Sequence, residues 1–420
     1  MTPQKRYGLA LAVFGWALIA ALTLYPNPSA VPLVAATPVW CIVCGRLGLV
    51  DVLLNVILFL PLGAGLGVLG LRFRHAVLLL FGTTLAVEVL QLWIPGRDSS
   101  LSDLLSNTLG GSLGFLLATT WRRLLLPAPA PARRLALGWM GGWLGLQLFS
   151  SWALQPSMPR STYFGQWAPE LGQFDQYTGR VDSVTLGGLP LGGTALPETD
   201  SVRALLLRGG ALLRVRALSG TPTERLAPIF SIFDDAQRNI LLLGEIGRDV
   251  VYAERDRLAR LRLRSPVFLL PYALPAGPGL PVTLEATRRD GRIEIRTAYT
   301  TADSVTHTAQ VTMQLSPSWS WAFVLPWGHT LGMETGVVTM LWLAVLFLPA
   351  GYWTHRARLL LRSPGGGSKR LGPGATLLGL VLVAGLAAMP VAFGFGLSGV
   401  SEWIGAAGGV VLGAKLRTED

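Results

Sequence analysis

Apolar runs of nearly the length that crosses a bilayer constrain this chain more than any other feature. A transmembrane helix needs about 20 residues. Eight windows reach or approach that length: 8–25, 50–71, 76–94, 101–119, 135–154, 333–350, 375–395 and 399–414. Only 14% of the residues are charged, whereas soluble proteins carry about 25%. The sequence therefore predicts an α-helical polytopic membrane protein with about eight transmembrane helices, the first an uncleaved span rather than a signal peptide.

Basic residues cluster in every second loop of this layout. The short loops assigned to the outer side carry only Arg46 and Arg97. The ends assigned to the inner side carry fifteen: Lys5, Arg6, Arg72, Arg74, Arg122, Arg123, Arg133, Arg134, Arg356, Arg358, Arg362, Lys369, Arg370, Lys415 and Arg417. This asymmetry follows the positive-inside rule, so we expect both termini in the cytoplasm and residues 155–330 outside it. The net charge of +11 then reflects topology, and no nucleic-acid partner is expected.

The middle of the chain has a different character from its flanks. Residues 155–330 are polar and rich in glycine and proline, with short alternating runs such as 211–217 and 282–286. Such runs predict strands, and Asp290-Gly291 is a hairpin signal. We therefore predict an inserted extracytoplasmic antiparallel β-sandwich. The expected domains are 1–154 with five spans, 155–330 as the sandwich, and 331–420 with three spans.

Two cysteines, Cys41 and Cys44, lie in the first outer loop. Their spacing fits either a local structural disulfide or a redox pair, and it does not decide between them. No second CxxC accompanies them, and Asp234 with Asp235 is the only adjacent acidic pair in 155–330. We therefore expect no metal site, calcium included, and no cofactor.

Polar side chains recur at the predicted outer ends of the second, third and fourth spans. They are Asp51, Asn55, Glu88, Gln91, Arg97, Asp103 and Asn107. Members of each pair are three or four residues apart and share a helix face. Because such groups are costly against lipid, we expect the faces to turn towards one another, with Arg97 reaching Glu88 or Asp103. The cluster could be a structural network of Glu88, Arg97 and Asp103, a ligand or catalytic site, or a surface-exposed scatter. Taken singly, Asp51 and Asp103 could also simply start their helices.

These residues carry a resemblance to a known family. The runs DVLLNVILFLPLG (51–63) and EVLQLWIPGRDSSLSDLLSNTLGGSLG (88–114) resemble the VanZ-like family. Its pattern has Asp and Asn before Phe-x-Pro-Leu-Gly, then Glu-x-x-Gln, Pro-Gly-Arg, Asp-x-x-x-Asn and spaced glycines. The match covers about residues 8–120. The family is named for a protein linked to glycopeptide antibiotic resistance, so the resemblance implies a bacterial inner or plasma membrane and a role at the cell envelope, without naming a reaction.

Two looser similarities complete the picture. The run from Pro228 to Pro266 resembles the central strands of a laminin-G-like or concanavalin-like jelly roll, whose members often bind glycans. Near the C-terminus, SEWIGAAGGVVLG (401–413) lines up with SDLLSNTLGGSLG (102–114), and Glu402 takes the place of Asp103. Glu402 is thus a candidate repeat acid. The alternative is that two helices rich in small residues look alike.

Two functions from different classes remain open. In the first, the outer domain binds a cell-wall or surface glycan and the membrane part anchors it in the lipid bilayer. In the second, the protein is a membrane-embedded enzyme or transporter for an anionic lipid-linked substrate, with Arg97 binding phosphate and Glu88 or Asp103 acting as acid or base. A pocket on which these side chains converge would favour the second function, and side chains that pair off would favour the first.

Overall fold

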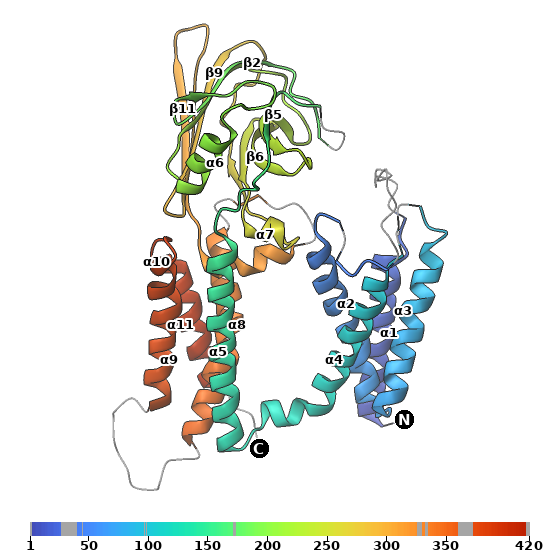
Figure 1. Ribbon diagram of the computed structural model, residues 1–420. Helices are drawn as coiled ribbons and strands as arrows, with labels where there is room; N and C mark the ends of the chain where they lie inside the picture. The colour runs from blue at the N-terminus through green and yellow to red at the C-terminus, as the bar shows by residue number, and fades with distance from the viewer. Residues whose placement is uncertain are drawn as a thin grey trace.

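The computed structural model describes residues 2–26, 40–43, 45–95, 97, 99–170, 174–325, 330–331, 335–359 and 373–416. Two groups of helices stand side by side, and a β domain lies at one end of them, mainly over the group that contains α5 and α8 (Figure 1). We call this end of the helices the β-domain end.

The first helix group is formed by the N-terminal quarter of the chain. Its members are α1 (Pro3–Thr23), α2 (Gly48–Val68), α3 (Phe73–Gln91) and α4 (Leu101–Leu125). Ser100 caps α4 by accepting a hydrogen bond from the Asp103 amide, and Arg122 and Arg123 lie in the last turn, where the helix dipole favours cations. Helix α2 lies between α1 and α4 and packs on both.

The second group contains α5 (Pro129–Ala153), α8 (Thr335–Leu359), α9 (Pro373–Val383), α10 (Met389–Ala392) and α11 (Val400–Lys415). A π-helical turn, η2 (Ala384–Ala388), joins α9 to α10. Pro390 lacks the amide hydrogen that would bond to the Leu386 carbonyl. The Ser398 amide donates to that carbonyl instead, at 3.1 Å. The chain therefore turns back towards α11 just after Pro390.

Five helical segments of the described residues are long and apolar enough to cross a membrane: α1, α2, α3, Thr335–Ala357 of α8, and Pro373–Ala392. This supports an integral membrane protein. Helices α4 and α5 do not meet the same criterion of apolar composition. Helix α11 has 16 residues, fewer than the about 20 that a span needs. Eight spans, and an extracytoplasmic middle domain, therefore stay predictions.

The middle of the chain forms two six-stranded sheets within the described residues, ordered β1-β5-β6-β7-β8-β12 and β11-β10-β9-β4-β2-β3. Their strands are β1 (Tyr163–Trp167), β2 (Arg180–Leu186), β3 (Leu189–Pro190), β4 (Leu213–Leu218), β5 (Ala227–Asp234), β6 (Asn239–Ile246), β7 (Asp249–Glu254), β8 (Val267–Leu270), β9 (Pro281–Arg289), β10 (Arg292–Thr300), β11 (Thr306–Gln314) and β12 (Thr330–Leu331). All pairings are antiparallel except β8 with β12. The predicted inserted β domain with antiparallel sheets is thus confirmed. Short helices α6 (Thr199–Arg208), α7 (Arg257–Arg260) and η1 (Pro317–Val324) complete it.

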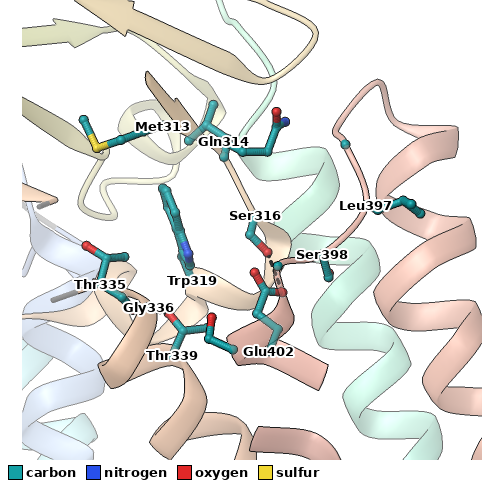
Figure 2. Close-up of a pocket in the computed structure, with 14 residues that line it drawn as sticks. Met313, Gln314, Ser316, Trp319, Thr335, Gly336, Thr339, Leu397, Ser398 and Glu402 are labelled. Carbon is teal, nitrogen blue, oxygen red and sulfur yellow. Dashed lines mark hydrogen bonds between the residues drawn. The ribbon is translucent and has the colours of Figure 1, made fainter. Parts of the chain in front are cut away.

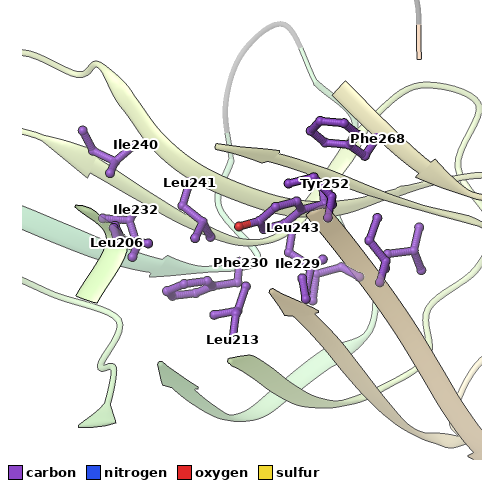
Figure 3. Close-up of a cluster of buried hydrophobic side chains, with 14 of the residues drawn as sticks. Leu206, Leu213, Ile229, Phe230, Ile232, Ile240, Leu241, Leu243, Tyr252 and Phe268 are labelled. Atoms are coloured by element: carbon purple, nitrogen blue, oxygen red, sulfur yellow. The ribbon is translucent and has the colours of Figure 1, made fainter. Parts of the chain in front are cut away.

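The inner faces of the two sheets meet in one apolar core (Figure 3). Alternation produces this core: Leu213, Val215 and Ala217 of β4 are buried, whereas Arg214 and Arg216 between them are exposed. Strand β5 is buried at every position, so both of its faces are covered. Val50 of α2 belongs to the same core, which joins the β domain to the first helix group.

The two helix groups are also tied together at the end remote from the β domain. The side chains of Tyr352, Trp353 and Arg356 on α8 donate hydrogen bonds to the carbonyls of Leu125, Leu124 and Pro127. The Trp353 bond is 2.8 Å long. Carbonyls at a helix C-terminus lack partners within the helix, so these donors hold the end of α4 against α8.

Candidate functional site

The predicted polar residues lie at the β-domain end of α2, α3 and α4. The Asn55 amide donates to the Asp103 carboxylate at 2.5 Å, which joins α2 to α4. The Asn107 amide donates to the Thr84 hydroxyl at 2.8 Å, which joins α4 to α3. Both contacts run between helices, as expected when polar groups turn away from lipid.

Glu88 is the most deeply placed acid of the three helices, with 8% of its surface exposed. Its carboxylate accepts from the Ser100 amide at 2.9 Å, and its backbone carbonyl accepts from the Ser99 hydroxyl at 2.6 Å. In a capping box, the third residue of the helix would take the amide of the cap residue. Here Glu88, from the preceding helix, takes it instead, and Asp103 remains available to Asn55.

Arg97 does not form the ion pair that we expected with Glu88 or Asp103. Its guanidinium donates to the carbonyls of Leu22 at 2.8 Å and Tyr25 at 3.0 Å, at the end of α1. Unpaired carbonyls and the negative end of the helix dipole both favour a cation at this position. Gln91 binds the same helix end, donating to the Thr23 carbonyl at 3.0 Å.

Asp51 lies in the first turn of α2 and is exposed. Arg264 of the β domain is the cation whose charge acts on it, and Asp103 is the neighbouring acid. Burial lowers the pKa of Arg264, and the Asp51 carboxylate opposes that shift. Asp51 therefore marks the junction between the first helix group and the β domain.

Of the two cysteines, Cys41 is disulfide-bonded, and Cys44 lies outside the described residues. Within the described part of the chain, no three His, Cys, Asp or Glu side chains are grouped so that they could hold a metal ion.

Glycines set a close approach between α2 and α4, the first helix pair. A Cβ atom on Gly110 would collide with the Val56 carbonyl oxygen, one on Gly114 with that of Leu60, and one on Gly63 with that of Gly111. Only glycine permits these backbones to lie so close.

Helices α8 and α11, the second helix pair, pack in the same register. A Cβ on Gly409 would collide with the Ala344 carbonyl oxygen, one on Gly413 with that of Leu348, and one on Gly351 with that of Val410. The two pairs correspond with constant offsets in residue number. Ala344 of α8 lies 288 residues after Val56 of α2, and Gly409 of α11 lies 299 residues after Gly110 of α4. The other two contacts of each pair have the same offsets.

The sequence contains a second sign of this repeat that our sequence analysis missed. Residues 59–63 of α2 read FLPLG, and residues 347–351 of α8 read FLPAG. The shared register places these two runs at equivalent positions. Similarity between two small-residue helices does not account for a match in both helices of the pair. The second helix pair thus repeats the packing register of the first.

The second helix pair has an acid at the equivalent position, but the residues around that acid differ from those of the first pair. Glu402 stands at the position of Asp103, Thr339 at that of Asp51, Leu343 at that of Asn55 and Gly396 at that of Arg97. The Glu402 carboxylate accepts from the hydroxyl of Ser316 at 2.9 Å (Figure 2). Ser316 lies between β11, the last long strand of the β domain, and η1. The β domain therefore contacts the acid of the second helix pair directly.

A cavity of about 240 Å³ adjoins Glu402 (Figure 2). Its walls come from the start of α8, the segment before α11, and the exit of the β domain. By the register above, Thr339 and Glu402 of this wall stand at the positions of Asp51 and Asp103 in the polar cluster.

Together these features define a helical membrane protein with an inserted two-sheet β domain. Residues 13–122, which span the second half of α1, all of α2 and α3, and α4 as far as Arg122, match the family model described as VanZ/LLP1. The N-terminal part of the chain is therefore a VanZ/LLP1 domain. Comparison with curated proteins and with solved structures found no match.

Proposed function

We propose that this protein is an envelope-associated membrane protein whose β domain binds a glycan outside the cytoplasm. The membrane helices anchor that domain in the bilayer and fix its orientation. The VanZ/LLP1 match supports the envelope setting. The polar outer face of the second β-sheet carries the proposal.

On this face, side chains that form hydrogen bonds run in rows across five strands. The pairing register aligns Thr185, Arg214, Glu285, Arg296 and Gln310 in one row. The next row contains Ser183, Arg216, Thr283, Ala298 and Thr308. Neighbouring side chains in a row are about 5 Å apart, the spacing of paired strands.

The chemistry of this face suits a polyhydroxylated ligand. Arg214 pairs with Glu285 at 2.7 Å, and the Arg296 Nε lies 2.7 Å from a Glu294 oxygen, so the guanidinium and carboxylate planes are held in place. Because Arg214 and Arg296 each have a carboxylate neighbour, their part of the face offers donors and acceptors without a strong net field. Such a surface favours a neutral or weakly charged glycan over a polyanion.

The β domain is mounted firmly on the helices, as an anchored binding module requires. The Arg257 side chain donates to the Trp152 carbonyl at 3.3 Å and lies 5.1 Å from the centre of the Trp152 ring. The Arg288 side chain donates to the Leu154 carbonyl at 2.6 Å. Both contacts join the domain to the end of α5.

The alternative, an enzyme or transporter for an anionic lipid-linked substrate, has less support from the geometry. It needs Arg97 to meet a phosphate, but Arg97 is bound to the carbonyls that end α1. Asn55 and Asp103 are paired, and Glu88 is bound to Ser100. These contacts favour a structural network in the first helix group.

The test uses the full chain in lipid nanodiscs and soluble fragments of bacterial cell-wall glycan. We expect saturable binding that weakens by about tenfold in Arg214→Ala or Arg296→Ala, since each loses a charged hydrogen-bond donor. Arg289→Ala is the matched control, because Arg289 is the last residue of β9, four positions along the strand from Glu285 and outside both rows. Binding that is absent in the wild type, or equal in all variants, would overturn the proposal.

A further inference from the structure

The cavity beside Glu402 is bounded by polar groups that have no partner for part of their bonding capacity. Glu402 has 5% of its surface exposed, and within the described residues it forms no salt bridge. The Thr335 hydroxyl, in a residue that is 4% exposed, has no hydrogen-bond partner there, and the buried Ser398 hydroxyl has none either. Because a buried hydroxyl without a partner destabilises the fold, both hydroxyls favour a ligand in the cavity that can bond to them.

The remaining wall is aromatic. Trp319 of η1 presents its indole to the same space, facing the side on which Glu402, Ser316 and Ser398 gather (Figure 2). The cavity volume of about 240 Å³ is several times the roughly 30 Å³ that one water occupies in the liquid. It can therefore take a small organic group as well as solvent.

We propose that this cavity binds a primary ammonium group. Glu402 supplies the counter-charge, the Thr335 and Ser398 hydroxyls accept the ammonium N–H groups, and the Trp319 ring provides a cation–π face. The proposal does not depend on glycan binding by the β domain, because it uses none of the residues on the outer sheet face.

Comparison of the two helix pairs supports a cation over other ligands. In the first group, the position of Leu343 is occupied by Asn55, whose amide donates to the acid. The second pair keeps the acid without this amide donor, and no cation lies among the residues that line the cavity. An anion would meet the Glu402 carboxylate without a compensating charge among the lining residues. A metal ion would find one carboxylate there, too few ligands for calcium.

The ammonium could belong to a soluble amine or to a phospholipid headgroup, and two probes separate these sources. The full chain in phosphatidylcholine nanodiscs is titrated with ethanolamine at neutral pH, with ethylene glycol as the uncharged control. In parallel, nanodiscs that contain phosphatidylethanolamine are analysed by native mass spectrometry for retained lipid. Ethanolamine binding alone indicates a soluble amine, and retention of phosphatidylethanolamine indicates the headgroup; either supports the proposal.

Variants locate the binding at this cavity. Glu402→Gln keeps the size of the side chain and the bond to Ser316, and it should weaken amine binding by about tenfold or more. Glu198→Gln, an exposed change elsewhere in the chain, should bind as the wild type does. Ser398→Lys places an ammonium in the cavity itself and should abolish probe binding while raising the thermal midpoint.

The outcomes distinguish the proposal from its failure even where one variant folds poorly. If Glu402→Gln does not keep the wild-type elution profile in size-exclusion chromatography, the test uses Ser398→Lys alone. This variant adds a charge that Glu402 attracts and removes none. The proposal is overturned if neither probe binds the wild type above the ethylene glycol control, or if Glu402→Gln and Ser398→Lys both bind as the wild type does.

Discussion

Glu402 and Asp103 occupy equivalent positions in two helix pairs that pack in the same register, each seven residues before a glycine that meets the partner backbone. Their partners differ. Asp103 is bound by Asn55 within its own helix pair, whereas Glu402 is bound by Ser316 from the exit of the β domain. The acid of the first pair is therefore bound within that pair, whereas the acid of the second pair is bound by the inserted domain. The β domain is inserted between α5 and α8, directly before the second pair begins.

The close-approach glycines of the second pair give a test of the shared register. Gly409→Ala should destabilise the protein by about 1–3 kcal/mol, because the added methyl meets the Ala344 carbonyl oxygen. Gly408→Ala is the control, since a Cβ at Gly408 has nothing within 4 Å. Thermal unfolding in detergent should show a lower midpoint for the first variant only. Equal midpoints for the two variants would contradict the packing described for α8 and α11.

Arg97 provides a second test, based on a double-mutant cycle. Arg97→Ala should destabilise the protein by about 1 kcal/mol through loss of its bonds to the α1 carbonyls, and Arg97→Lys should restore only part, since one ammonium cannot reproduce the two-pronged guanidinium. Combined with Glu88→Gln, the effects should add to within about 0.5 kcal/mol, because the two side chains share no bond. A larger coupling energy would indicate that Arg97 and Glu88 form the ion pair that we expected from the sequence.

The sequence predicted the membrane class, the inserted β domain and the first helix group because each rests on a local signal. Apolar length, alternation in strands such as β4, and the residues of the VanZ-like pattern can all be read within short windows. The i,i+4 spacing also placed Asn55 and Asp103 on faces that meet.

Other features depended on contacts that no short window contains. Arg97 was expected to prefer a carboxylate, but the end of α1, more than 70 residues earlier, offers carbonyls that the sequence does not mark as free. The role of Ser316 at Glu402 depends on the path by which the chain leaves the β domain. The repeat of FLPLG in FLPAG was visible, yet its meaning required both helices of each pair to be compared at once.

Topology remains to be tested directly. We expect a periplasmic reporter such as alkaline phosphatase to be active when fused near residue 250, and inactive when fused after residue 365, because of the distribution of basic residues. A cytoplasmic reporter at the same two positions should give the opposite pattern. Phosphatase activity at residue 365 but not at 250 would invert the layout, and the proposal of an external glycan-binding domain would fall with it.

The last prediction concerns a carboxyl group buried in the β domain. Glu245 of β6 has 3% of its surface exposed, and one of its oxygens has no hydrogen-bond partner in the described residues. Burial raises the pKa of Glu245 to about 7. A folded-state pKa above the unfolded value means that the folded protein binds the extra proton, so stability is greatest below the unfolded pKa and falls as pH rises to about 7. Asp256, whose pKa burial raises to about 6, acts in the same direction.

The thermal midpoint of the full chain should therefore be higher at pH 5 than at pH 8. Glu245→Gln should reduce this difference, by an amount on the order of 2 kcal/mol in unfolding free energy, while the exposed control Glu224→Gln should leave it unchanged. A midpoint difference that is the same in the wild type and in Glu245→Gln would show that the Glu245 carboxyl titrates normally in the folded protein.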